Sequence, residues 1–99
     1  MRNGVAAEPL WLSGSYDRET LCIHFTWRNE PAAVAALTPR IEAALAPFSP
    51  RPHWGTVNTL DAAAVATAHP RVADAKALFE GLDPESRFAN SHLVRLGIR

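Results

Sequence analysis

The residues best suited to chemistry lie together in one short stretch, Arg51-Pro52-His53-Trp54-Gly55-Thr56. It offers an imidazole, an indole N–H and a hydroxyl, directly after a stiff, proline-rich approach. The glycine among them allows the backbone to come close to a ligand or to a second chain. The same residues also suit a structural role, in which Trp54 fills the core and His53 is a satisfied polar neighbour. From the residues alone we favour that structural role.

Other kinds of site find little support in the sequence. The remaining histidines are His24, His69 and His92, and their spacing is not typical of a metal site. The lone cysteine, Cys22, cannot make a cysteine-rich zinc site. There is also no local signature of a nucleophilic triad and no glycine-rich phosphate loop. We therefore assign no metal ligand and no catalytic residue.

Composition sets limits on the class of protein. A chain of 99 residues, 47% of them hydrophobic, is long enough for one domain, residues 1–99, and too apolar for a disordered segment. A formal net charge of zero gives no electrostatic basis for binding nucleic acid. No apolar run is long enough for a transmembrane helix, and the first ten residues do not resemble a signal peptide. We expect a cytoplasmic location.

A period of two in hydrophobicity predicts the first strand, over residues 20–28. Its apolar positions are Leu21, Ile23, Phe25 and Trp27, and they alternate with Cys22, His24, Thr26 and Arg28. A shorter apolar run at residues 10–13 predicts a second strand, with a loop at residues 14–18 between the two. The simplest arrangement is an antiparallel pair.

The middle of the chain predicts a helix followed by an extended stretch. Asn29-Glu30-Pro31 is a typical helix start, and apolar residues then recur at helical spacing as far as Phe48. Pro39 lies inside this pattern and removes a backbone donor, so we expect a kink there. Residues 52–57 then resemble a third strand.

The last third of the chain predicts short helices. One begins near Thr59 or Asp61 and ends before His69, and another begins at Pro70 and ends at a Gly81 cap. Asp83-Pro84 resembles a further helix start, and residues 88–93 an irregular tail or a single turn. We predict an α+β fold, a small antiparallel sheet with helices packed on one face. Its edges are either covered by those helices or completed by strands outside this chain.

Four blocks of this sequence resemble FAD-dependent sugar-lactone and polyol oxidases of the vanillyl-alcohol-oxidase flavoprotein group. The stretch Arg51–Thr56 resembles the family's Lys/Arg-Pro-His-Trp-Gly-Lys signature, and residues 82–90 resemble its Asp-Pro-x-x-x-Phe-x-Asn ending. Residues 10–13 and 24–27 are similar to the alditol (xylitol) oxidase branch, which stands beside the D-arabinono-1,4-lactone oxidases. The blocks occur in order along nearly the whole chain.

The resemblance implies a fragment of a larger flavoenzyme, its C-terminal substrate (cap) domain, with the FAD-binding domain absent. In that family FAD takes up a hydride from an alcohol or lactone carbon, and the protein positions that carbon. FAD is then the expected cofactor, although this chain alone is not expected to bind it. The substrate of the parent enzyme would be a polyol or a sugar lactone.

Three residues carry the family's contacts by position. Thr26 matches a threonine that hydrogen-bonds a polyol hydroxyl, and His53 matches a histidine beside the isoalloxazine ring. Thr56 stands where the family has a substrate-contacting lysine, and a threonine has neither its reach nor its charge. The family's Glu-x-Arg pair falls at residues 1–3, where the acid is missing and Arg2 fits only with a one-residue shift.

Three interpretations follow from the missing flavin domain. We favour a remnant or truncated product that is inactive by itself. The second is the cap subunit of a split enzyme, whose FAD domain is a separate chain. The third is a small binding or self-associating module, for instance a homodimer, that has kept the scaffold without the chemistry.

Overall fold

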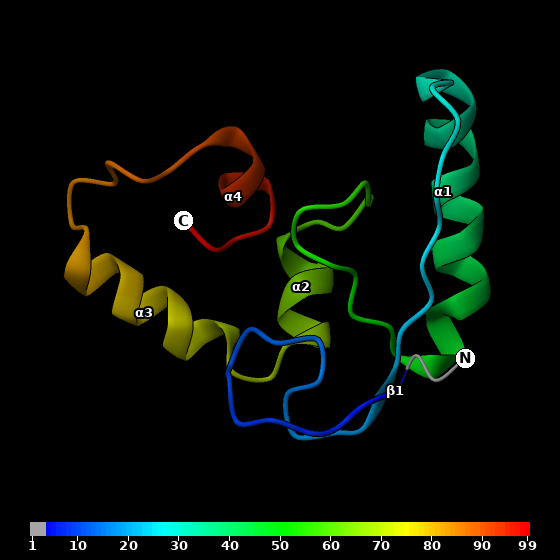
Figure 1. The fold of residues 1–99 in the computed structure, drawn as a ribbon. Coiled ribbons are helices and arrows are strands. Elements are labelled where there is room, and N and C mark those ends of the chain that lie inside the picture. Colours follow the sequence, from blue (N-terminus) through cyan, green and yellow to red (C-terminus); the bar gives the residue numbers. More distant parts are fainter. Residues whose placement is uncertain (1–3) are drawn as a thin grey trace. The chain divides into compact units, whose positions relative to one another are not determined.

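The structure, a computed structural model, describes residues 4–99. They divide into two compact units, Met1–Thr59 and Leu60–Arg99, and each is described by itself. Along residues 4–99, two strands are followed by four α-helices, and Figure 1 shows the path of the chain through them. The predicted α+β class with a small antiparallel sheet is confirmed. The assignment of residues 1–99 to one domain of the family type stays a prediction.

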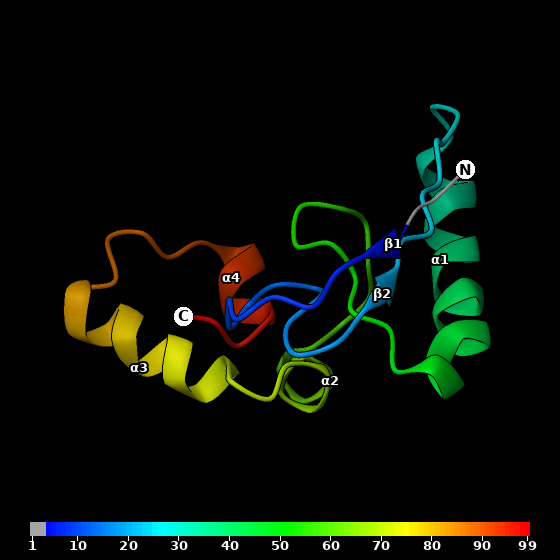
Figure 2. The ribbon, with the colours of Figure 1, turned by 60° about the horizontal axis from the view of Figure 1, so that its bottom comes forward.

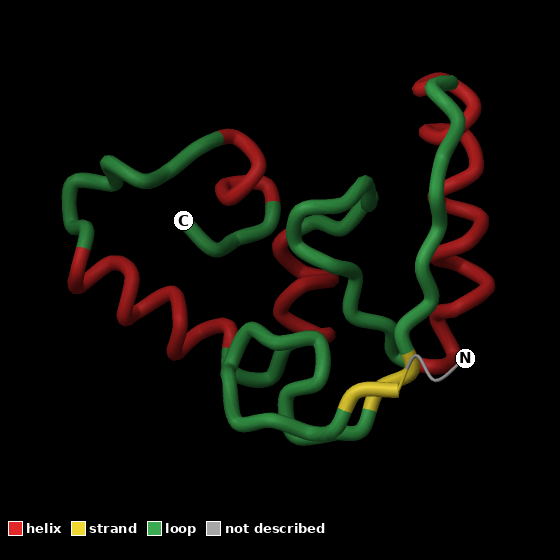
Figure 3. The backbone as a smooth tube through the Cα atoms, viewed as in Figure 1, coloured by secondary structure: helices red, strands yellow, loops and turns green. Residues whose placement is uncertain are grey.

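The sheet of the first unit consists of β1 (Gly4–Val5) and β2 (Thr20–Leu21), coloured yellow in Figure 3. The strands are antiparallel, with Gly4 opposite Leu21. The strand predicted at residues 10–13 is wrong, because the Ser13 N–H donates to the Leu10 carbonyl at 3.0 Å and closes a turn. The apolar run there is short and is followed by turn-forming residues, so the chain reverses instead of extending.

The strand predicted over residues 20–28 is correct only at its start. The pairing of β1 with β2 ends at Leu21, and residues 22–28 continue without regular secondary structure. Figures 1 and 2 both show this segment running beside helix α1 (Pro31–Leu45). Its apolar side chains are all exposed: Leu21 by 72%, Ile23 by 56%, Phe25 by 45% and Trp27 by 39%. The alternation is therefore present without a sheet to cover it.

Helix α1 begins at Pro31 as predicted and continues into a 3-10 turn, η1 (Ala46–Phe48). It runs through Pro39 without a break. The turn ends at Ser49, whose φ of 50° is left-handed. The proline-rich residues 50–52 follow this turn and lead into His53.

The second unit contains helices α2 (Ala62–Ala68), α3 (Val72–Leu82) and α4 (Ser91–Arg95). Helix α2 packs against α3. Asp61 caps α2 by accepting from the Ala64 N–H at 2.9 Å, and Asn90 caps α4 in the same way through Leu93. The buried apolar side chains of the unit are Val65, Ala75, Leu96 and Ile98. The short helix predicted before His69 is confirmed. In the tail, predicted to be irregular or a single turn, the short helix α4 begins at Ser91.

Three predicted helix boundaries in this unit differ from the structure, and the first is the start of α3 at Val72 instead of Pro70. Gly81 lies inside α3 and does not cap it, since the Asp83 N–H still donates to the Phe79 carbonyl at 2.8 Å. No helix begins at Asp83-Pro84. The Asp83 carboxylate instead accepts from the Arg87 N–H at 2.8 Å and the Phe88 N–H at 3.0 Å, which closes a turn. A residue that can cap a helix can equally organise a turn.

Candidate functional site

The motif stretch forms a turn, so the third strand predicted at residues 52–57 is wrong. The Thr56 N–H donates to the His53 carbonyl at 3.1 Å, and the Thr56 hydroxyl donates to the same oxygen at 2.9 Å. Glycine and a hydroxyl residue favour a turn at this spacing over an extended chain. The hydroxyl predicted to contact substrate is thus directed into its own turn.

Two long-range contacts fasten this turn to the loop between β1 and β2. The Trp54 Nε1–H donates to the Leu12 carbonyl at 2.7 Å. The Arg51 Nη1 donates to the Tyr16 carbonyl at 2.8 Å and, more weakly, to the Gly14 carbonyl at 3.4 Å. Both side chains therefore bind backbone that is distant in sequence, and His53 lies between them along the chain.

The electrostatic setting of Arg51 follows from its position. Desolvation lowers the pKa of its guanidinium, and the neighbouring charge of Arg18 lowers it further, while Asp17 and Tyr16 act in the opposite direction. An arginine remains protonated through such a shift. Arg51 is therefore a permanent cationic donor to two carbonyl groups.

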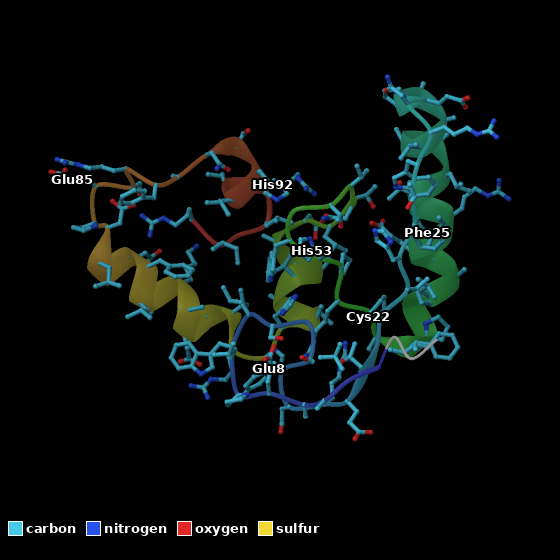
Figure 4. The ribbon with its side chains drawn as sticks, in the orientation of Figure 1. Glu8, Cys22, Phe25, His53, Glu85 and His92 are labelled. Carbon is cyan, nitrogen blue, oxygen red and sulfur yellow. The ribbon has the colours of Figure 1, made fainter. Side chains whose placement is uncertain are left out.

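His53 is exposed, in contrast to its two anchoring neighbours. Figure 4 shows its side chain on the turn that they hold. Its Nδ1 atom accepts from the Gly55 N–H at 3.2 Å. One edge of the ring is thus engaged locally, and the ring is open to a ligand or another chain. The structural role that we favoured from the residues fits Trp54, which is half-buried, and does not fit His53.

Thr26 lies on the exposed segment that runs along α1. A small hollow of about 250 Å³ is lined by residues nearby in the sequence, and neither Thr26 nor Thr56 lines it. Trp27 and Val57, the residues that follow Thr26 and Thr56, both line it. Pro31, Val34 and Ala35 of α1 provide the rest of its apolar wall. The structure thus places Trp27 and Val57 around one hollow, and within residues 4–99 no hydrogen bond joins Thr26 to His53 or Thr56.

One polar cluster in the same unit was not predicted. The Glu8 carboxylate accepts from the Ser13 hydroxyl and, at 3.2 Å, from the Ser15 hydroxyl, which is buried. The Ser15 backbone N–H donates in turn to the Ser13 hydroxyl oxygen at 3.1 Å. This cluster shapes the loop whose carbonyl groups receive Arg51 and Trp54. Ser-Gly-Ser at residues 13–15 signals a turn, but nothing in the spacing pairs it with Glu8.

In the second unit, the block resembling the family's ending makes a structural clasp. The Asp83 carboxylate accepts from two backbone N–H groups and from Arg99 Nη2 at 2.8 Å, with side chains only 12% and 4% exposed. Hydrogen bonding by the Phe88 N–H lowers the pKa of Asp83, and the Arg87 N–H and the Arg99 charge lower it further against desolvation. Figures 1 and 2 show the C-terminal end, which Arg99 forms, between α3 and α4.

The remaining predictions concern a metal site, a membrane span, residues 1–3 and the cellular location. Among residues 4–99, no three histidine, cysteine or acidic side chains are grouped so that they would hold a metal ion. None of the helices in that range combines the length and apolar character needed to cross a membrane. The expected Glu-x-Arg position, residues 1–3, lies outside the described residues. The cytoplasmic location stays a prediction.

Comparison with known proteins agrees with these blocks. Residues 3–96 match the family model of D-arabinono-1,4-lactone oxidase. The chain is also similar to the alditol oxidase of a Streptomyces species, with 46% identity over 89 residues. That alignment covers 90% of this chain and 21% of the length of the relative, so the chain spans about a fifth of it. The chain belongs to the D-arabinono-1,4-lactone oxidase family.

Proposed function

We propose that this chain is the C-terminal, substrate-domain segment of an FAD-dependent oxidase acting on alditols or aldonolactones, and that it is inactive by itself. The observation that carries the proposal is the turn at residues 51–56. Arg51 and Trp54 hold it within the chain, yet the His53 ring is exposed. A polar ring held at the surface in this way suits contact with a group that another part of the enzyme provides.

The residues present fit a single edge of a flavin and not a whole flavin site. His53 offers one exposed ring, while the glycines of the chain are too widely spaced for a phosphate-binding loop. When bound, FAD supplies the acceptor for a hydride from the substrate carbon. His53 would contact the flavin, and Thr26 and Thr56 would hydrogen-bond hydroxyl groups of a polyol or sugar lactone.

The substrate contact at Thr56 is the weakest of the three. Its hydroxyl donates within its own turn to the His53 carbonyl at 2.9 Å, so its proton is used and the oxygen can only accept from a ligand. The family signature has a lysine here, with a longer reach and a positive charge. We therefore expect a poor oxidase even after this segment is joined to a flavin domain.

A chimera tests this proposal directly. The chain replaces the aligned segment of the Streptomyces alditol oxidase, and oxidation of xylitol is followed by peroxide release. We expect Thr56→Lys to raise kcat/KM at least tenfold and Thr26→Val to lower it about tenfold, because each changes one polar contact to the substrate. Absorbance of bound flavin confirms that each variant is loaded.

The isolated chain is the matched control. It should neither retain FAD nor release peroxide with xylitol. Tight flavin binding together with polyol-dependent peroxide release by the chain alone would overturn its inactivity. A flavin-loaded chimera that is indifferent to both threonine substitutions would overturn the assigned substrate contacts.

A second candidate function, a binding module, is favoured by the exposed apolar side chains along residues 21–27. In that case the segment associates with a separate FAD-domain chain, as in a split enzyme, or with a second copy of itself. Light scattering of the pure chain and copurification with a co-expressed flavin domain separate these cases. A stable monomer that captures no flavin domain would remove this candidate.

A further inference from the structure

The contact between His53 and Gly55 determines which ring nitrogen faces outward. A backbone N–H is always a donor, and that of Gly55 lies 3.2 Å from His53 Nδ1. A ring nitrogen that accepts a hydrogen bond uses its lone pair and carries no proton. The neutral ring must then carry its proton on Nε2, the nitrogen on the opposite side.

The surroundings hold this contact in place without a ligand. Arg51 and Trp54 flank His53 and bind backbone carbonyl groups at 2.8 Å and 2.7 Å. Pro52 restricts the backbone between them. A Cβ atom at Gly55 would lie 3.4 Å from His53 Cε1, so the ring lies directly against the glycine backbone. The turn is organised before any partner arrives.

We infer that His53 is presented as a neutral Nε2–H donor. The Gly55 N–H sets its tautomer, and Arg51 and Trp54 act as positioning residues. The ligand atom opposite His53 is accordingly a hydrogen-bond acceptor, such as a carbonyl oxygen or an unprotonated ring nitrogen. Only the identity of that ligand as a flavin rests on the proposed function, since the tautomer is a property of this chain.

Nitrogen NMR of the isolated, ¹⁵N-labelled chain tests the tautomer. At about pH 8.5, we expect Nε2 of His53 to show the shift of a protonated nitrogen and Nδ1 that of an unprotonated one. Gly55→Pro removes the donor and should lower the ratio of the two tautomers about fivefold, the factor for about 1 kcal/mol of hydrogen-bond free energy. Gly55→Ala keeps the N–H and should retain the ratio.

The indole N–H of Trp54 shows whether the turn has survived each substitution, since it is bonded to Leu12. If Gly55→Pro shifts that signal, the wild-type and Gly55→Ala spectra still decide, because a protonated Nδ1 in either would overturn the inference. An unchanged tautomer ratio in a Gly55→Pro chain with an intact indole signal would also overturn the role of the Gly55 N–H.

The ligand is tested separately in the chimera. A glutamine amide places its donor near the position of Nε2, and an asparagine amide near that of Nδ1. We expect His53→Gln to keep flavin affinity within about threefold and His53→Asn to lose at least tenfold, a factor that corresponds to about 1.4 kcal/mol. Equal flavin affinity in wild type and both variants would overturn the flavin contact of the proposed function while the measured tautomer still stands.

Discussion

The turn at residues 51–56 and the segment at residues 21–27 belong to the same unit, yet they are held in different ways. The turn is tied by side chains to distant backbone, through Arg51 to Tyr16 and through Trp54 to Leu12. The segment leaves the paired strands at Leu21, and each of its apolar side chains is exposed in part. The first region is held by hydrogen bonds within this chain, whereas among the described residues the second is covered only in part, with 39–72% of each apolar side chain exposed.

The difference follows from what each kind of structure requires. A turn needs a few donors and acceptors, and a single arginine or tryptophan supplies them from within the chain. A strand with one apolar face needs neighbouring strands and an opposing layer, because an isolated two-stranded sheet is marginal in water. A short piece of a family fold can therefore keep its turns while its strands lose their partners.

The largest expected effect concerns a side-chain clasp of the same type in the second unit. Asp83→Asn removes the charge that Arg99, 4% exposed, is paired with, and weakens two bonds from backbone N–H groups. Because removing one partner of a buried pair leaves the other uncompensated, we expect the greatest fall in thermal stability among the variants discussed here. Far-UV circular dichroism of the helices measures it.

The same clasp predicts the pH dependence of stability. The folded pKa of Asp83 is below its unfolded value of roughly 4. Its stabilisation is therefore complete above that unfolded value and is lost as the pH falls through the folded pKa. Asp83→Asn should lack this acid-sensitive part. Asp74→Asn is the control, since its pair with Arg71 is exposed and contributes little. Equal acid sensitivity in wild type and Asp83→Asn would contradict the clasp.

The sequence predicted well those elements whose signals are local. Pro31 begins the long helix, and Asp61 caps the next one, because a cap acts on backbone within three residues of itself. Strand pairing is not local. Hydrophobic alternation at residues 20–28 predicts a strand but does not indicate which residues pair with it. Among the described residues, the pairing with β1 ends at Leu21.

The candidate site was predicted in part for the same reason. His53 stands out by residue type, and the structure leaves it exposed on its turn. The roles of Arg51 and Trp54 could not be predicted from the sequence, since they bind carbonyl groups more than thirty positions away. A backbone carbonyl carries no residue-specific signal. The Glu8 cluster was missed because its serines resemble any polar turn.

The next effect in size tests the anchoring of the turn. Arg51→Met removes the cationic donor to Tyr16 and Gly14, and we expect a loss of about 2 kcal/mol in the free energy of unfolding of the first unit. Arg51→Lys keeps the positive charge but lacks the planar set of guanidinium donors, so it should recover part of the lost free energy of unfolding. Tryptophan fluorescence during urea unfolding reports on this unit, because Trp11, Trp27 and Trp54 all precede residue 60. Wild-type stability of Arg51→Met would show that Trp54 alone holds the turn.

The smallest effect is expected on the segment. Ile23 is 56% exposed, so Ile23→Ser should change the free energy of unfolding by less than about 0.5 kcal/mol. It should nevertheless reduce the binding of a hydrophobic dye, since it removes part of the exposed apolar row, while Ile23→Val should leave dye binding unchanged. A loss of about 2 kcal/mol from Ile23→Ser would mean that the segment is packed in the free chain. The contrast between the turn and the segment would then disappear, because Ile23 would already be packed against other residues of the isolated chain.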